Sequence, residues 1–318
     1  MKNLSVFLLS AVVLGSFTRA VACDSCALYI ADGADRPGFT GTVAPQFTSL
    51  GTVQDGDAEL PNPVNQYLDS LNTQFVAGYS QGGPWHLQLT LPYIVKTYRR
   101  PEHAEIETGR VSGIGDTTLA GQYRAWQHTS ARGDEFTFNV LGGIKFATGD
   151  ADHLGDEIGH PHHHHADFPD SGVHGHDLAL GSGSTDYVFG GDANWTHGRL
   201  FLRGSIQYKL RTPGAFDYEV ADETSWELGA GGHVVLTHKH SLAVQALLTE
   251  EHKGLDTLAG EPQVDTGISV RYAGARVHGT IGQRFAADAS VELPIRIRTS
   301  ETMVVPDYRL RGAVTWRF

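Results

Sequence analysis

Apolar and polar residues alternate along most of the chain after residue 36. Near the C-terminus, Leu310, Val314 and Trp316 alternate with Arg309, Arg311 and Arg317. Successive side chains of a β-strand point to opposite faces, so this pattern predicts a strand with one apolar and one charged face. The same alternation recurs at 85–95, 136–146 and 198–211.

The pattern predicts twelve strands whose connections are alternately long and short. The long connections 51–69, 98–110 and 149–181 follow the first, third and fifth strands, and we expect the charged stretch 99–109 to be an ordinary outer loop. Short turns are expected at Gly82-Gly83, Arg132-Gly133, His197-Gly198 and His238-Lys239. The predicted strands are 37–50, 70–80, 84–97, 111–127, 133–148, 182–196, 198–211, 222–237, 239–253, 263–273, 284–298 and 306–318.

Two features distinguish a membrane barrel from a soluble sandwich, which also alternates. Long outer loops alternating with short turns, and aromatic residues near strand ends, are typical of outer-membrane barrels. A closed barrel also leaves no unpaired strand edge in lipid. We therefore predict an all-β fold, a transmembrane antiparallel up-and-down barrel over 37–318 with both termini in the periplasm. The aromatic residues near strand ends are Tyr79, Trp85, Tyr93, Tyr98, Trp195, Trp226, Tyr272, Tyr308 and Trp316.

The first 22 residues have the features of a secretory signal peptide. Lys2 precedes an apolar run over 4–17, and Ala20-Val21-Ala22 supplies the small residues of a cleavage site. We expect export to the outer membrane of a Gram-negative cell. Residues 23–36 would then form a short periplasmic segment before the barrel.

Composition excludes several other classes of protein. The net charge of −12 argues against nucleic acid as a partner, because phosphate binding needs a basic surface. Two cysteines in 318 residues exclude a disulfide-built scaffold. We expect no enzymatic activity and no required cofactor. The expected partners are outer-membrane lipid and small solutes or metal ions.

Two stretches resemble a known family. Ser112–Arg124 and Gly142–Asp150 are similar to the outer-membrane barrel family described as the MetA pathway of phenol degradation, as are Val291–Pro294 and the Tyr-containing final strand. The resemblance covers about residues 70–318, with the His-rich loop as an insertion. It implies a barrel transporter, and it suggests uptake of phenolic or other hydrophobic or aromatic-acid compounds.

The polar face of the predicted strands would line a pore rich in bases. One interpretation is a lumen stiffened by Arg–carboxylate pairs, and the other is a positive funnel that passes anions. A barrel of twelve strands is also narrow enough for side chains or the N-terminal segment to fill. The predicted lumen bases are Arg124, Lys145, Arg203, Lys209, Arg211, Arg271, Arg296, Arg298, Arg309, Arg311 and Arg317, and the carboxylates are Asp116, Asp192, Glu227, Asp265 and Glu292.

The longest loop, 149–181, is a candidate metal-binding segment. Clustered imidazoles with carboxylates suit Zn, Cu or Ni. Their spacing defines no rigid tetrahedral centre, and a solvated low-complexity tract is the other interpretation. The candidate ligands are His153, His160, His162, His163, His164, His165, His174, His176, Asp167 and Asp170.

Cys23 and Cys26 at the expected mature N-terminus leave three interpretations open. They could form a disulfide or thiol pair, bind a metal, or carry a lipid anchor at Cys23. The expected function is an outer-membrane channel for small solutes whose outer loop binds divalent transition metals. A non-conducting structural barrel that docks a periplasmic metal or redox partner protein is the rival.

We predict that Zn(II) and Cu(II) binding by the loop weakens as the pH falls below about 6, because neutral imidazole is the ligand. A metal titration of the refolded barrel, beside a variant lacking 160–176, measures this. Equal and weak binding by both forms would contradict a metal-binding role for the loop.

Overall fold

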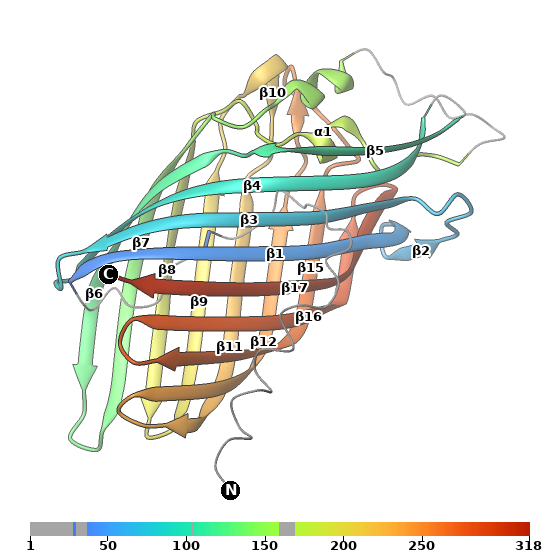
Figure 1. The fold of residues 1–318 in the computed structure, drawn as a ribbon. Coiled ribbons are helices and arrows are strands. Elements are labelled where there is room, and N and C mark those ends of the chain that lie inside the picture. Colours follow the sequence, from blue (N-terminus) through green and yellow to red (C-terminus); the bar gives the residue numbers. More distant parts are fainter. Residues whose placement is uncertain (1–27, 30–36, 103–104, 159–168) are drawn as a thin grey trace, which may run out of the picture.

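Twelve antiparallel strands form a closed barrel in the computed structural model, which describes residues 28–29, 37–102, 105–158 and 169–318 (Figure 1). Each wall strand pairs with its neighbours along the chain, and the predicted fold class is confirmed. The wall strands are β1 (Gly38–Asp55), β3 (Tyr67–Ser80), β4 (Trp85–Glu102), β6 (Thr117–Thr129), β7 (Asp134–Phe146), β8 (Asp186–His197), β9 (Leu200–Leu210), β11 (Glu223–Leu236), β12 (His240–Lys253), β15 (Ile268–Ile281), β16 (Phe285–Thr299) and β17 (Met303–Arg317).

Pairing of the last strand with the first closes the wall. β17 runs antiparallel to β1 from the pair Thr40–Arg317 to the pair Gln54–Met303, with irregularities near Leu50. This pairing gives both terminal strands a second hydrogen-bonded neighbour, so neither presents an open edge.

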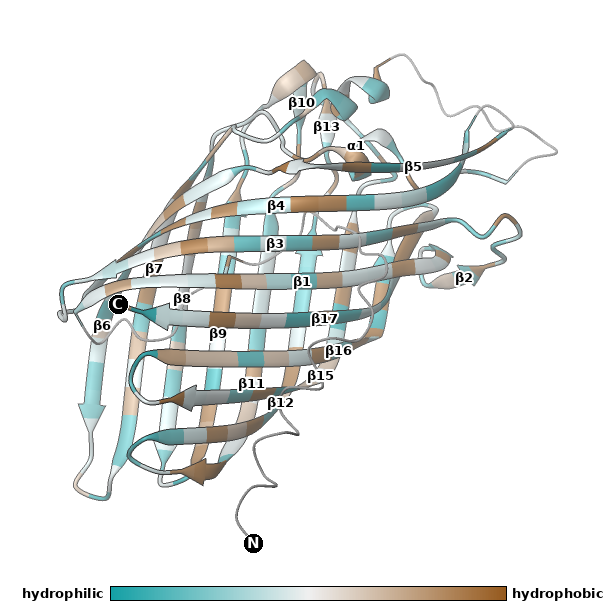
Figure 2. Cartoon of the chain, in the orientation of Figure 1, coloured by the Kyte–Doolittle hydropathy of each residue, from teal (hydrophilic) through white to brown (hydrophobic). Residues whose placement is uncertain are grey.

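The two faces of the wall follow the predicted alternation. On β17, the side chains of Leu310 and Trp316 are 42% and 47% exposed, whereas Arg309 is 1% exposed. Cross-strand partners share a face, so the buried polar residues line the lumen and the exposed apolar residues form the outer surface. Figure 2 shows apolar and polar positions alternating along the strands.

The barrel has two different ends, which we call the turn end and the loop end. Short turns at the turn end join β3 to β4, β6 to β7, β8 to β9, β11 to β12 and β15 to β16, and the C-terminus lies there (Figure 1). Outward aromatic pairs at this end include Phe39–Tyr79, with ring centroids 4.8 Å apart, and Trp85–Tyr123 at 4.6 Å. Two residues predicted for the aromatic belts, Tyr98 and Tyr272, are instead buried on the inner face.

Short elements cover the loop end and form what we call the cap. Leu154, Ala179 and Tyr218 make a small core within it. Val173 and Leu178 pack against Leu50 of β1 and Val304 of β17, which lie on the inner face of the wall near the loop end. No helix among the described residues is long and apolar enough to cross a membrane. The cap comprises η1 (Asp152–Glu157), α1 (Gly175–Leu178), η2 (Ala215–Asp217), β10 (Tyr218–Glu219), β13 (Thr257–Leu258) and β14 (Glu261–Pro262), and β2 (Ala58–Leu60) extends β1 beside it.

Strand pairing in the wall is interrupted beside β5. β5 (Glu105–Ile114) pairs with the outer half of β4, whereas β6 pairs with both β4 and β7. Residues 99–102 and 105–109, expected to lie in a loop, are therefore strand residues of β4 and β5. Beside β5, the chain that leads into β8 packs against the inner face of β4. There Leu180 packs against Ile94, and the N–H groups of Leu180 and Gly181 donate to the carbonyl of Asp150 at 2.9 and 2.8 Å.

We predict that Gly181→Ala destabilises the barrel by about 1–3 kcal/mol, the usual cost of overpacking. A Cβ at Gly181 would lie 2.7 Å from the Cα of Gly149 and 2.7 Å from a carboxylate oxygen of Asp116. Urea unfolding in lipid measures the change. Gly142→Ala is the matched control, because nothing lies within 4 Å of its Cβ position. An equal effect of both substitutions would contradict the account.

Candidate functional site

Two cavities lie in the lumen between residues that the structure describes. A cavity of about 440 Å³ lies toward the turn end, where Glu135, Thr196 and Phe201 line it. A smaller cavity of about 80 Å³ lies toward the loop end and is lined by Lys145, Leu180 and Arg211 among others. Leu28 and Gln74 line both cavities, so they mark the boundary between them.

Leu28 and Tyr29 cross the lumen at this boundary. Gln207 of β9 donates to the carbonyl of Leu28 and accepts from its N–H, both at 3.0 Å. On the other side, Gln74 of β3 accepts from the N–H of Tyr29 at 3.1 Å, and Gln88 of β4 donates to its carbonyl at 2.8 Å. Segment 23–36 was expected in the periplasm, and its described part lies instead inside the barrel. Glutamine amides replace strand pairing for this short segment.

One ion-pair network joins five neighbouring strands of the inner wall. Arg309 contacts Glu251 and Glu292 at 2.6 Å each, and its guanidinium stacks 4.0 Å from the ring centre of Tyr272. Arg276 binds Glu227 through two hydrogen bonds of 2.6 and 2.8 Å. Bidentate Arg–carboxylate bonds are the stronger and more specific kind of ion pair. The network comprises Glu227, Glu251, Arg276, Glu292, Arg309 and Arg311.

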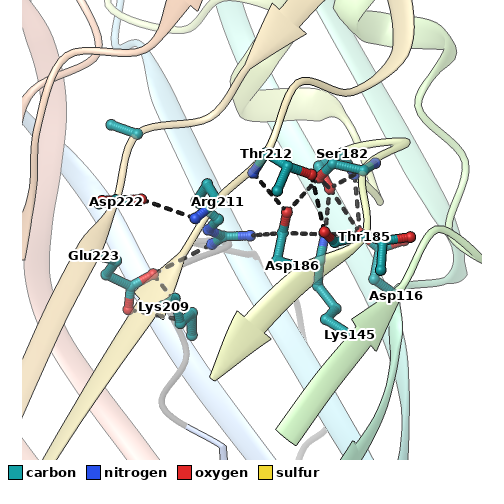
Figure 3. Close-up of polar contacts among 12 residues, drawn as sticks. Asp116, Lys145, Ser182, Thr185, Asp186, Lys209, Arg211, Thr212, Asp222 and Glu223 are labelled. Carbon is teal, nitrogen blue, oxygen red and sulfur yellow. Dashed lines mark hydrogen bonds and ion pairs between the residues drawn. The ribbon is translucent and has the colours of Figure 1, made fainter. Parts of the chain in front are cut away.

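A second network, centred on Asp186, lies beside the smaller cavity (Figure 3). The Asp186 side chain is 1% exposed and pairs with Lys145 at 2.7 Å and with Arg211 at 3.0 Å. Arg211 and Lys209 both reach Glu223, at 3.4 and 3.0 Å. Alternating charges of this kind compensate one another where the side chains are buried.

Asp116 connects this network to the interruption in the wall. Its carboxylate accepts from Lys145 at 2.5 Å and from the backbone N–H groups of Gly149 and Ser182 at 2.9 and 3.0 Å. Asp116 and Gly149 lie in the two stretches that carry the family resemblance. Those two stretches therefore meet at Asp116, beside the interruption in strand pairing.

The structure places eight of the eleven predicted lumen bases on the inner face and three on the outer face. Ile295 forms a β-bulge, because Arg271 pairs with Arg296 while Tyr272 pairs with Pro294. The bulge reverses the alternation, so Arg296 and Arg298 point outward. Arg271 shares their face, and its partner is Glu250 at 2.6 Å. The expectation was wrong at Arg271 because it placed the neighbouring Tyr272 on the lipid-facing surface. Tyr272 instead points into the barrel, where its ring stacks with Arg309, so Arg271 points outward.

Several inner-face charges were missed from the sequence. The bases are Arg276 and Lys96, and Lys96 donates to the carbonyl of Ala179 at 2.5 Å. Asp265 lies in the β14–β15 connection rather than in the wall. Five further carboxylates face the lumen, so the expected surplus of bases is largely removed. Parity along the observed strands would have found them, and they are Glu135, Asp186, Glu223, Glu251 and Asp288.

The candidate metal ligands are only partly brought together. His153 pairs with Asp156 at 2.9 Å on the exposed surface of η1, and the carbonyl of Asp170 accepts from Gln66. His174 and His176 lie together, and the structure adds Asp265, each offering a ligand atom within 4.8 Å of the others. His160, His162, His163, His164, His165, Asp167, Cys23 and Cys26 lie outside the described residues.

Carboxylates around His176 control its charge. Burial favours the neutral ring, but the carboxylates of Asp177 and Glu157 outweigh it and raise the pKa of His176 to about 9. Burial would raise the pKa of Glu157, yet its hydrogen bond from His176 prevails and lowers that pKa to about 2. The pair is therefore ionic at neutral pH in the absence of a metal.

The closed, outwardly apolar wall and charged lumen define a β-barrel of the outer-membrane type. The model of the family described as "Putative MetA-pathway of phenol degradation" matches residues 34–160, which confirms the resemblance over that region rather than over 70–318. No curated protein matches the sequence.

Solved structures agree with this fold. The COG4313 outer membrane channel from Pseudomonas putida F1 is 14% identical, with a TM-score of 0.57 over 93% of this chain and 98% of that one. The beta domain of the Bordetella autotransporter BrkA is 12% identical, with a TM-score of 0.47 over 89% of this chain and 100% of that one. At such identities the first likeness establishes the fold alone, and the second carries no argument.

We predict that Asp186→Asn destabilises the barrel by about 3 kcal/mol, because it removes one partner from two buried cations. Urea unfolding in lipid measures the loss. Asp57→Asn is the control, since Asp57 pairs with Arg298 where the two side chains are 67% and 56% exposed. That pair should contribute less than about 1 kcal/mol. Equal losses would show that the Asp186 network does not stabilise the wall.

Proposed function

We propose that the chain is an outer-membrane channel that passes small solutes, with its turn end and both termini in the periplasm. The observation that supports this most strongly is the polar lumen, in which a cavity of about 440 Å³ is separated from a second one by Leu28 and Tyr29. Interiors of outer-membrane barrels are polar where they conduct water and solutes. A barrel whose only task is structural needs no such cavity.

Passage through this channel requires the N-terminal segment to move. Hydrogen bonds with Gln74, which accepts, and with Gln88 and Gln207, which donate, hold Leu28 and Tyr29, and the Tyr29 hydroxyl donates to Asp288 at 3.3 Å. Each such bond contributes about 0.5–1.5 kcal/mol net, because water replaces it when it breaks. These few hydrogen bonds therefore suffice to keep Leu28 and Tyr29 between the two cavities, yet they cost little enough to break for a passing solute to displace these residues.

Paired charges favour small polar solutes over strongly charged ones. In the larger cavity, Arg276 and Arg311 face Glu227 at distances of 2.6 and 3.5 Å. Such a wall presents both donors and acceptors, so its net field should be weak. We infer that neutral polar or zwitterionic molecules are the best matched cargo, in place of the anion preference suggested by an excess of bases.

Uptake of phenolic or related compounds is the second candidate function. The matched family description supports it, and the larger cavity also has apolar contributions from Leu28 and Phe201. The two candidate functions predict different results in conductance and uptake measurements. A phenolic cargo should bind in the lumen and reduce ion conductance, whereas a small polar solute such as glycine should enter liposomes that contain the barrel.

We also propose that the outer His/Asp-rich segment binds divalent transition metals. The support is His174 and His176, which lie together with Asp265 at the loop end. Clustered imidazole and carboxylate ligands suit such ions. A binding role of this kind is compatible with the channel and needs no catalytic step.

We predict that Glu227→Gln makes the channel more anion-selective, because Arg276 and Arg311 lose a shared carboxylate. Reversal potentials in a KCl gradient measure this, and the permeability ratio of chloride to potassium should rise severalfold. Asp57→Asn removes a carboxylate outside the lumen and should leave the ratio unchanged. A barrel without measurable conductance would overturn the channel and favour a structural role.

A further inference from the structure

We propose that His174, His176 and Asp265 form a binding site for one divalent transition-metal ion of the Zn²⁺ kind. The ion would join the segment inserted between β7 and β8 to the β14–β15 connection. This inference rests on the proposed metal-binding role of the outer segment. It assigns that role to a defined site whose third ligand lies far away in the sequence.

The three side chains already converge. One ligand atom from each lies within 4.8 Å of the other two. The Nδ1 atom of His174 is 3.3 Å from Oδ2 of Asp265, and the two imidazole rings stack with centroids 5.6 Å apart. A tetrahedral zinc centre with bonds of about 2.0–2.1 Å holds its ligand atoms about 3.4 Å apart. Small side-chain rotations therefore suffice to close the site around an ion.

A neighbouring carboxylate orients one ligand as metal sites require. Nδ1 of His176 is hydrogen-bonded to Glu157 at 3.0 Å, and the same oxygen accepts from the His176 backbone N–H at 2.7 Å. A His ligand commonly donates its second ring nitrogen to a carboxylate, which leaves the other nitrogen to bind the metal. Nε2 of His176 is buried and makes no hydrogen bond within the part of the chain that the structure describes. Glu157 therefore acts as a positioning residue.

Burial and charge favour a cation at this position. The side chains of His176 and Asp265 are each 5% exposed, and that of His174 is 15% exposed. Asp177 lies 3.6 Å from Nε2 of His176, and Tyr218 stacks beside the ring with its hydroxyl on Asp256. Lys253 pairs with Asp256 at 3.0 Å and so compensates that carboxylate. The negative charges of Glu157 and Asp177, 3.0 and 3.6 Å from the two ring nitrogens of His176, also favour a dication here.

An ion at this site would steady the cap over the smaller cavity. His176 lies in α1, and α1 leads directly into Ala179 and Leu180, of which Leu180 lines that cavity. Asp265 precedes β15 on another part of the wall. Joining these two connections limits their relative movement. Three protein ligands also leave a fourth position for water or a small anion.

Zinc titration of the full barrel in lipid nanodiscs tests this site. Calorimetry with ZnCl2 should show one tight component per chain, and Co²⁺ should give the strong visible absorption of a four-coordinate ion. Asp265→Asn, which preserves shape, and His176→Gln should each weaken this component more than about tenfold. His252→Gln is the matched control, because His252 is exposed on β12. Circular dichroism verifies that every variant folds.

A fourth variant, with His162–His165 changed to Ser, separates this inference from the broader proposal. If it retains the tight component while Asp265→Asn loses it, the site is supported. If it loses the component while Asp265→Asn and His176→Gln keep it, the assigned site is wrong and binding by the loop survives. Absence of any tight component overturns the inference, whereas conductance of the same preparation tests the channel independently.

Discussion

The fold depends on backbone hydrogen bonding between neighbouring strands around a closed ring. Lipid offers no hydrogen-bond partner, so a strand left with one unpaired edge would be strongly destabilised. The β1–β17 pairing meets this requirement over nearly the full length of both strands. Beside β5, which pairs with β4 alone among the described strands, the N–H groups of Leu180 and Gly181 donate to Asp150, and Asp116 accepts from the backbone N–H groups of Gly149 and Ser182. The cap and the inner networks are positioned by this arrangement.

Closure of a narrow barrel imposes a second requirement, since charges on the inner face have little water around them. Arg309, at 1% exposure, is acceptable because two carboxylates and the Tyr272 ring surround it. The same pairing leaves the larger cavity polar without a strong net field. The N-terminal residues Leu28 and Tyr29 then divide the remaining space. The stability of the wall and the polarity of the lumen therefore depend on the same side chains.

The sequence was informative wherever side-chain alternation was regular. The faces of β4, β7, β9 and β17, the short turns and the closed barrel followed from period-two patterns and connection lengths. The bulge at Ile295 could not be read from the pattern, because one inserted residue reverses every later side chain. The lumen position of Leu28 depends on contacts with Gln207, 179 residues away. Asp265 is likewise separated from His176 along the chain by four wall strands, β8, β9, β11 and β12, so only the folded structure brings the two together.

The central claim is that Leu28 and Tyr29 divide the lumen and must move for a solute to pass. Single-channel conductance of the mature chain, compared with the same chain lacking residues 23–36, tests this most directly. The account predicts a higher and less fluctuating conductance for the shortened chain, because the two cavities would merge. Equal conductance of the two chains, both correctly folded, would contradict it.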